Sequence, residues 1–385
     1  MSDRPDLVTR RELLAAGLTV AGGALLVPTL VRQLAALQPP GTAGAGGARD
    51  VLIRNARAFD AEAPIAALTD VRTATAHHYV RSHFGPPQRL PRTWTLTIDG
   101  GVQRPVTLTL DEIRRMDGAV THPVTLECAG NGRGLFGLPK TSGIQWGYGA
   151  VSTATWTGVP LAALLERAGL QADARHLWME GLDRAPAGSV PKFLRSIPRE
   201  VGLEGTFVAY AMNDGPIPLH NGGPLRLLVP GWSGMASTKW LTHVHAMPVE
   251  SDNFYMKNGY RYADGSGVTA LRPKSVIAAP LDGARVRAGR VAMRRQACSG
   301  RGSGGISGVD VSADGGRTWR AARLLGTEQP GAWRTWEADV DVTAGDAVLV
   351  ARATDASGAT QPMQPEANPG GFGNNVVHRV AIHAA

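Results

Sequence analysis

The sequence predicts an α+β domain over about residues 49–265, followed by an all-β sandwich of immunoglobulin type over 266–385. Up to about Gly265, strand-like alternation is mixed with segments that carry helix start and stop signals, whereas only strand-like segments follow. The 385 residues include 48 glycines and 26 prolines. Glycine and proline together therefore make up a larger fraction of the chain than the average of about 12%. It indicates many turns and therefore many short strands.

Local signals place the elements of the first domain. Residues 94–98 (WTLTI) alternate, and a DGG turn separates them from a second alternating segment. Pro160 opens the clearest helix, VPLAALLERA, and Gly169 ends it. In chain order we expect strands at 94–98, 106–110 and 124–127, helices at 110–116 and 159–168, and a strand at 225–229.

The second domain shows no helical periodicity. Turn clusters such as Asp314-Gly315-Gly316 separate its strand-like segments. Several strands at this spacing within about 100 residues are typical of an immunoglobulin-like sandwich. The expected strands are 275–279, 308–312, 319–325, 333–342, 347–354 and 376–382.

The N-terminal residues 1–48 are predicted to be an export signal and a flexible linker. Arg10 and Arg11 precede an uncharged stretch over 13–31, which is the pattern of a twin-arginine signal. An uncleaved membrane anchor is the alternative, but three glycines and Pro28 lower the hydrophobicity of the stretch. We therefore expect a periplasmic or otherwise exported protein that folds, and takes up any cofactor, before export.

Composition excludes several classes of function. The net charge of +8 comes from scattered arginines without a basic stripe, which argues against nucleic-acid binding and leaves open an electropositive pocket for a small anion. Two cysteines are too few for a four-cysteine zinc site, and the absence of CxxCH excludes covalently attached haem. Two GxGxxG matches, at 132–137 and 300–305, lack the strand-to-helix context of nucleotide binding.

Cys128 is the strongest candidate functional residue. It ends the strand 124–127 and begins the run C-A-G-N-G-R, so its side chain is placed at a strand end with Arg133 nearby. A thiolate is a soft ligand for transition metals, and a neighbouring arginine favours the ionised form.

Around these residues the chain resembles the sulfite oxidase family of molybdenum enzymes. The hallmark strand ending in C-A-G-N is present at 126–131, and Y-V-R-S-H at 79–83 is similar to the family's aromatic-x-R-x-H segment. WGYGAVSTATWTG at 146–158, N-G-G-P-L-R-L-L-V-P-G with T-K-W-L, and K-N-G-Y-R are similar to further family segments. The C-terminal part is similar to the family's immunoglobulin-like dimerisation domain.

The resemblance implies a role for each matching residue. The molybdenum ligand would be Cys128. Substrate-pocket residues would be Arg81, Arg133, Trp146, Tyr260 and, on looser spacing, Arg334. Contacts to the pyranopterin (molybdopterin) cofactor would come from Tyr79, His83, Asn131, Asn221, Arg226, Thr238 and Lys239.

The implied activity is oxidation of sulfite to sulfate, with electrons passed to an external acceptor such as a c-type cytochrome, because no haem motif lies in this chain. Asn221 stands where many members have histidine, which leaves a sulfane or sulfoxide substrate as an alternative. A non-catalytic exported binding protein is the alternative from another class. The resemblance also implies a homodimer.

Overall fold

The computed structural model describes residues 49–385, apart from 138–139 and 367. The predicted export signal and linker, 1–48, lie outside these residues. Within the part that is described, no helix is both long enough and apolar enough to cross a membrane.

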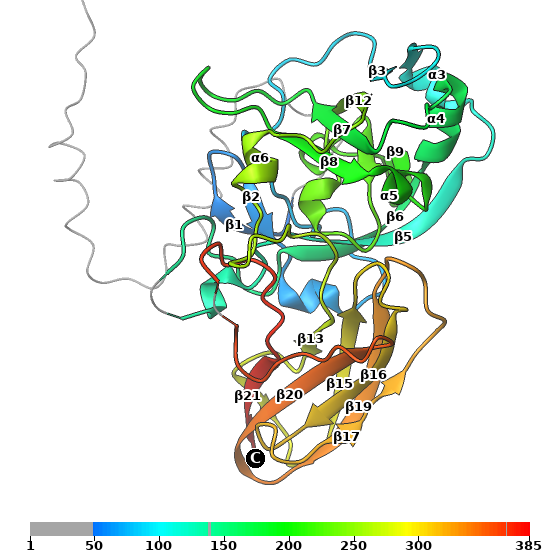
Figure 1. Cartoon of the computed structure of the whole chain (residues 1–385). Coiled ribbons are helices and arrows are strands. Elements are labelled where there is room, and N and C mark those ends of the chain that lie inside the picture. The colour runs from blue at the N-terminus through cyan, green and yellow to red at the C-terminus, as the bar shows by residue number, and fades with distance from the viewer. Residues whose placement is uncertain (1–48, 138–139, 367) are drawn as a thin grey trace, which may run out of the picture. The chain divides into compact units, whose positions relative to one another are not determined.

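The first domain consists of sheets joined by short helices (Figure 1). One antiparallel sheet has the order β10 (Gly215–Pro216), β9 (Phe207–Met212), β6 (Val151–Pro160), β5 (Val120–Glu127), with β11 (Arg226–Leu228) also paired to β9. The other has the order β4 (Val106–Thr109), β3 (Thr95–Gly100), β12 (Leu241–Met247), β7 (His176–Gly181), β8 (Leu194–Pro198). In this second sheet β3 and β12 are parallel. A hairpin of β1 (Leu52–Asn55) and β2 (Asp60–Glu62) precedes both sheets.

The two helices that the sequence predicts both form, each beginning at its expected signal, and the remaining helices were not predicted. In α3 (Leu110–Arg114) the Thr109 side chain and Glu112 form a capping box. In α4 (Leu161–Ala168) Pro160 precedes the first turn, and Gly169 ends the helix at a φ of 71°. Glycine adopts this left-handed conformation without strain. The other helices are α5 (Arg199–Leu203), α6 (Phe254–Lys257) and the 3-10 turns η1 (Ile65–Leu68), η2 (Arg133–Leu135), η3 (Leu219–Asn221) and η4 (Gly234–Ala236).

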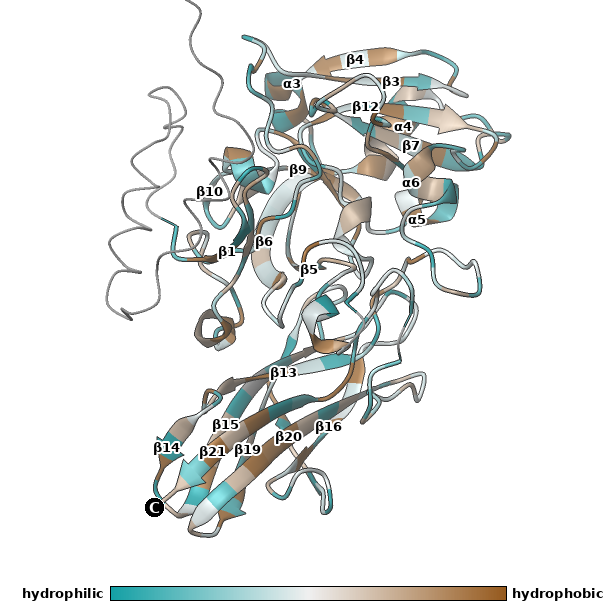
Figure 2. Cartoon of the chain, turned by 90° about the vertical axis from the view of Figure 1, so that its left-hand side faces the viewer, coloured by the Kyte–Doolittle hydropathy of each residue, from teal (hydrophilic) through white to brown (hydrophobic). Residues whose placement is uncertain are grey.

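The second domain is a β-sandwich. One sheet has the order β13 (Lys274–Ala279), β15 (Gly289–Cys298), β19 (Arg334–Val342), β18 (Arg323–Leu324). The other has the order β14 (Ala284–Val286), β21 (His378–Ala384), β20 (Gly345–Asp355), β16 (Ile306–Ser312), β17 (Arg320–Ala321). Buried side chains from both sheets, among them Met293, Trp336 and Leu349, form one apolar core. Figure 2 shows apolar and polar residues alternating along these strands, as two-layer packing requires.

The predicted order of a mixed α+β domain followed by a β-sandwich is confirmed. The immunoglobulin-type topology of the sandwich stays a prediction. The expected boundary at 265/266 falls between α6 and β13. The segment predicted as one strand over 319–325 is two short strands, β17 and β18, which pair with different sheets. β15, in the centre of its sheet, was not predicted.

Candidate active site

A cavity opens where β5 ends. The empty space at this site, including open solvent at its mouth, is about 700 Å³. Its walls come from the segment before β3, the end of β5, the loop between β7 and β8, and the segments around β11 and after α6. The lining side chains that carry polar atoms or sulfur are His78, Tyr79, Arg81, Ser82, His83, Cys128, Asp183, Asn221, Arg226, Met235, Ser237, Thr238, Lys239, Trp240 and Tyr260.

Cys128 presents its thiol to this cavity from the first residue after β5. The turn that follows is fixed by backbone hydrogen bonds. The Cys128 amide donates to the Ala150 carbonyl (2.9 Å), and the Asn131 amide donates to the Cys128 carbonyl (2.8 Å). Burial raises the pKa of the thiol, and the positive charges of Arg81 and Arg133 act in the opposite direction. A metal ion would bind the thiolate, which these two cations favour.

Arg81 is held on the cavity wall by a buried carboxylate. Its Nη1 lies 3.2 Å from both carboxylate oxygens of Asp60 and also donates to the Ser82 carbonyl. Asp60 is fully buried in β2 and accepts the Ser82 amide at 2.9 Å. In the described chain the hydrogen bonds of Arg81 use Nη1, so the rest of the guanidinium can bind an anion.

Tyr260 and His83 meet at the same wall. The Tyr260 hydroxyl lies 3.2 Å from His83 Nε2. Burial raises the pKa of Tyr260 to about 12, so the phenol keeps its proton at neutral pH. Burial and the Arg81 charge hold the pKa of His83 well below its usual range, so its ring is neutral. Tyr260 can therefore donate a hydrogen bond either to His83 or to a ligand in the cavity.

A second group of polar residues lines the part of the cavity formed by β11 and the segment before β12. Arg226 donates to the carbonyls of Asn221 (2.5 Å) and Ser237 (2.9 Å). Lys239 donates to the Ser82 hydroxyl (3.0 Å) and to the His220 carbonyl (2.6 Å). Burial lowers the pKa values of both cations, Arg226 to about 10 and Lys239 well below its usual value.

Several buried polar atoms in or near this part of the cavity have no hydrogen-bond partner among the residues that the structure describes. They are Arg49 Nη1, His78 Nε2, His220 Nδ1, Arg226 Nε and Thr238 Oγ1. Leaving a buried polar atom unpaired costs about 1–3 kcal/mol, and more for a charged group. A polar, anionic group bound in the cavity would satisfy the atoms of the lining residues His78, Arg226 and Thr238 and offset the burial of Arg226 and Lys239.

Comparisons with known proteins identify the family. An oxidoreductase molybdopterin binding domain matches residues 83–255, and a Mo-co oxidoreductase dimerisation domain matches 266–385. Sulfite oxidase from Gallus gallus is 33% identical over 335 residues, which cover 80% of this chain and 72% of that protein. The chain belongs to the sulfite oxidase family.

Two further relatives extend this result. Mitochondrial sulfite oxidase from Macaca fascicularis is 34% identical over 361 residues, 86% of this chain but 66% of the relative, so the chain spans just under two thirds of that protein. The crystal structure of the sulfane dehydrogenase SoxCD from Paracoccus pantotrophus superposes with a TM-score of 0.75 at 26% identity, covering 93% of this chain and 96% of that one.

The protein is thus an oxidoreductase with a molybdenum cofactor, and its cavity suits that group. Cys128 offers the soft thiolate that a transition metal prefers. The unpartnered donors near Arg226 and Thr238 match the phosphate and the heteroatoms of a pterin. Of the residues predicted for the cofactor, Tyr79, His83, Asn221, Arg226, Thr238 and Lys239 line the cavity.

Arg133 lies close to Cys128 but outside the cavity lining. Its Nε donates to the Gly370 carbonyl (3.2 Å) and its Nη1 to the Ile144 carbonyl (3.1 Å), and the guanidinium lies 5.2 Å from the Phe372 ring centroid. A Cβ on Gly130 would come within 2.7 Å of this guanidinium, so the glycine of C-A-G-N makes room for it. Arg133 acts on the thiol through its charge in this conformation.

The structure places three further predicted residues, Trp146, Asn131 and Arg334, outside the cavity lining. Trp146 does not line the cavity: it is fully buried in the apolar core behind Cys128. The Asn131 side chain stabilises the turn after β5, because it accepts a hydrogen bond from the Ala150 amide (3.1 Å) and donates one to the Glu127 carboxylate (3.0 Å). Arg334 begins β19 in the sandwich and pairs with Glu328 at 3.6 Å, away from the cavity.

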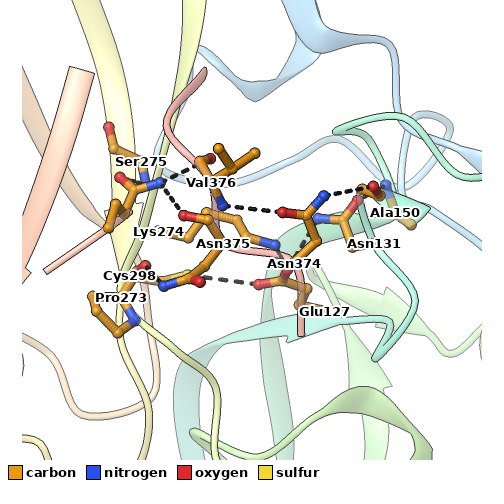
Figure 3. A network of polar contacts seen from close by, with 12 residues as sticks. Glu127, Asn131, Ala150, Pro273, Lys274, Ser275, Cys298, Asn374, Asn375 and Val376 are labelled. Atoms are coloured by element: carbon orange, nitrogen blue, oxygen red, sulfur yellow. Dashed lines mark hydrogen bonds and ion pairs between the residues drawn. The ribbon is translucent and has the colours of Figure 1, made fainter. Parts of the chain in front are cut away.

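The sandwich supports the turn that carries Cys128. The buried side chains of Glu127 and Lys274 form an ion pair between β5 and β13 (Figure 3). Asn374 donates to the Gly132 carbonyl at 2.7 Å, and the Gly373 amide donates to the Ala129 carbonyl at 2.8 Å. The loop that follows Cys128 is therefore shaped by both domains.

Proposed function

We propose that this protein oxidises sulfite to sulfate and passes the electrons to an external one-electron acceptor such as a c-type cytochrome. The observation that carries the proposal is that a thiol, an arginine and a phenol, Cys128, Arg81 and Tyr260, line one cavity. The overall change is sulfite plus water to sulfate, two protons and two electrons, and the acceptor takes the electrons. The molybdenum cofactor, when bound through Cys128, supplies the oxygen-atom transfer and the two-electron redox capacity.

The side chains of the chain itself bind and orient the anion. Arg81 offers charged donors whose direction is fixed by Asp60. Tyr260 remains a phenol up to high pH, since burial raises its pKa to about 12, and it can donate to a sulfite oxygen. The neutral ring of His83 accepts from Tyr260 in the absence of substrate and so keeps the hydroxyl at the cavity.

The direct test is sulfite-dependent reduction of ferricyanide by protein purified from a molybdenum-replete host, with molybdenum content measured on the same sample. Turnover with bound molybdenum supports the proposal. Bound molybdenum without sulfite turnover would contradict it and direct the search to another sulfur substrate. Protein that folds but holds no molybdenum would favour the non-catalytic binding protein.

Arg81→Gln should raise the KM for sulfite by roughly 10- to 100-fold, with a smaller fall in kcat. The charged hydrogen bonds that it removes are worth about 1.5–3 kcal/mol. Arg72→Gln is the matched control, because Arg72 forms an exposed pair with Asp214 and should leave KM unchanged. Steady-state kinetics of both variants check this, and an unaltered KM in Arg81→Gln would remove Arg81 from the substrate site.

Tyr260→Phe should lower kcat roughly 10- to 100-fold, because a hydrogen bond to a charged ligand is worth about 1.5–3 kcal/mol. Since the raised pKa of about 12 keeps the phenol protonated, wild-type kcat should show no Tyr260 titration between pH 7 and 10. The pH profiles of wild type and Tyr260→Phe should therefore be parallel. If kcat of the wild type rose or fell between pH 7 and 10 and this change was lost in Tyr260→Phe, Tyr260 would ionise within that range.

A sulfane substrate is the second candidate. The close superposition on the sulfane dehydrogenase SoxCD favours it. Asn221 also lines the cavity at the position that prompted this alternative, where it accepts from Arg49 at 2.6 Å. Parallel assays with sulfite and with a protein-bound sulfane as electron donors separate the two, since each candidate predicts the higher kcat/KM for its own substrate.

The proposal also covers where the protein is located and whether it forms a dimer. Residues 1–48 would direct twin-arginine export to the periplasm, with membrane anchoring as the alternative if the signal stays uncleaved. The double variant Arg10→Lys/Arg11→Lys should remain in the cytoplasm, and cell fractionation measures this. The match of 266–385 to a dimerisation domain supports a homodimer, and light scattering on the purified protein tests it.

A further inference from the structure

Arg195 is a buried cation beside the active site that the sequence did not single out. It lies in β8, and only 4% of the residue is exposed. No carboxylate lies within ion-pair distance of it in the described part of the chain. The carboxylate whose field reaches it, Glu250, already pairs with Arg261 at 3.8 Å. A buried charge without a partner is costly, so its presence here requires an explanation.

The side chain of Arg195 is directed at Tyr260. Its guanidinium carbon lies 5.2 Å from the centroid of the Tyr260 ring. The same ring stacks on Phe372, with centroids 5.2 Å apart and planes at 29°. Arg195 Nη1 donates to the Tyr255 carbonyl in α6, while Nε has no protein partner.

The charge of Arg195 adds to that of the two arginines already described. Arg81 lies on the cavity wall, and Arg133 lies against the ring of Phe372, on which Tyr260 also stacks. All three cations act electrostatically on Tyr260. Three positive charges thus act on the phenol that lines the cavity, and in the described part of the chain the charge of Arg195 is not paired with a carboxylate.

We propose that Arg195 is a positioning residue that orients Tyr260 by stacking on its ring and supplies a buried positive charge that strengthens the binding of an oxyanion in the cavity. The identity of that oxyanion as sulfite rests on the proposed function. The two roles are separable: the charge acts on affinity, whereas the planar guanidinium acts on the orientation of Tyr260 and therefore on turnover.

A purely structural role would be to anchor α6 through the Tyr255 carbonyl. Arg261 provides the matched control, because its Nε anchors the same helix by donating to the Met256 carbonyl at 2.8 Å and its side chain does not line the cavity. If anchoring of α6 were the whole effect, Arg261→Gln should resemble the Arg195 variants.

The experiment measures sulfate binding to the holoprotein by calorimetry, together with kcat and KM for sulfite. Arg195→Gln should weaken sulfate binding about tenfold, a loss of about 1.4 kcal/mol. Arg195→Lys, which keeps the charge but not the planar group, should bind sulfate within about threefold of wild type and still lose kcat. Arg261→Gln should match the wild type in both measurements. Arg195→Met, of similar volume, is made in parallel to cover a failure of Arg195→Gln to fold.

Wild-type sulfate affinity in folded Arg195→Gln or Arg195→Met would overturn the inference, as would equal losses in Arg195→Lys and Arg261→Gln. Because sulfate binding needs no turnover, the result is independent of the proposed function. An enzyme that binds molybdenum but does not oxidise sulfite would contradict the function, and the calorimetry would still decide the role of Arg195.

Discussion

Cys128→Ser should abolish turnover, by more than about 100-fold, while the protein folds as the wild type does. Loss of a residue that merely supports a metal ligand typically costs 10- to 100-fold, and loss of the ligand itself should exceed that. A serine oxygen is a harder donor than a thiolate and does not ionise at neutral pH. The backbone bonds of Cys128 to Ala150 and Asn131 do not involve the side chain, so the turn should survive.

Cys298→Ser is the matched control, because it replaces the other cysteine of the chain. Cys298 is buried in β15 and lies outside the cavity lining. Molybdenum content, circular dichroism and sulfite turnover, measured on both variants, test whether the loss is specific to Cys128. Equal losses in the two variants would show that the effect comes from removing a buried thiol, not from removing a metal ligand.

Local signals were sufficient for two of the helices, α3 and α4, and for several strands. Pro160 and Gly169 bound α4 because they act through the backbone of their own segment. β15 was missed for the opposite reason. Its buried Val291 and Met293 alternate with the exposed Arg290, Ala292 and Arg294, and it becomes a central strand only by pairing with β13 on one side and β19 on the other.

For the candidate site, too, the sequence could not predict contacts that only the folded chain brings about. Motif similarity placed Cys128, Arg81 and Tyr260 on the sequence, and the structure brings them to one cavity. The motif also singled out Trp146, whose side chain lies in the apolar core and not on the cavity lining, because a motif does not tell which side of a turn faces the core. Asp60 and Arg195 belong to no motif and reach the site through β2 and β8, so only the folded chain shows them.

Lys274→Met should lower the free energy of unfolding by about 3–5 kcal/mol, because it leaves the carboxylate of Glu127 buried without its cation. Both side chains of this pair are about 6–7% exposed. Asn131 Nδ2, at 3.0 Å, would remain as a neutral donor to the carboxylate, and the Cys298 thiol lies 3.9 Å away. Neither group can replace the ammonium charge.

Lys192→Met makes the same change in an ion pair with Glu180 whose lysine side chain is 44% exposed. Such pairs contribute about 0–1 kcal/mol, so urea denaturation should separate the two variants clearly. The double variant Glu127→Gln/Lys274→Met removes both charges and keeps an oxygen acceptor for Asn131, so it should recover at least half of the lost stability. If Lys274→Met lost no more than Lys192→Met, the pair would not be the link that holds the turn of Cys128 against the sandwich. A large loss with recovery in the double variant would show that the second domain stabilises the metal-binding turn through this charge pair.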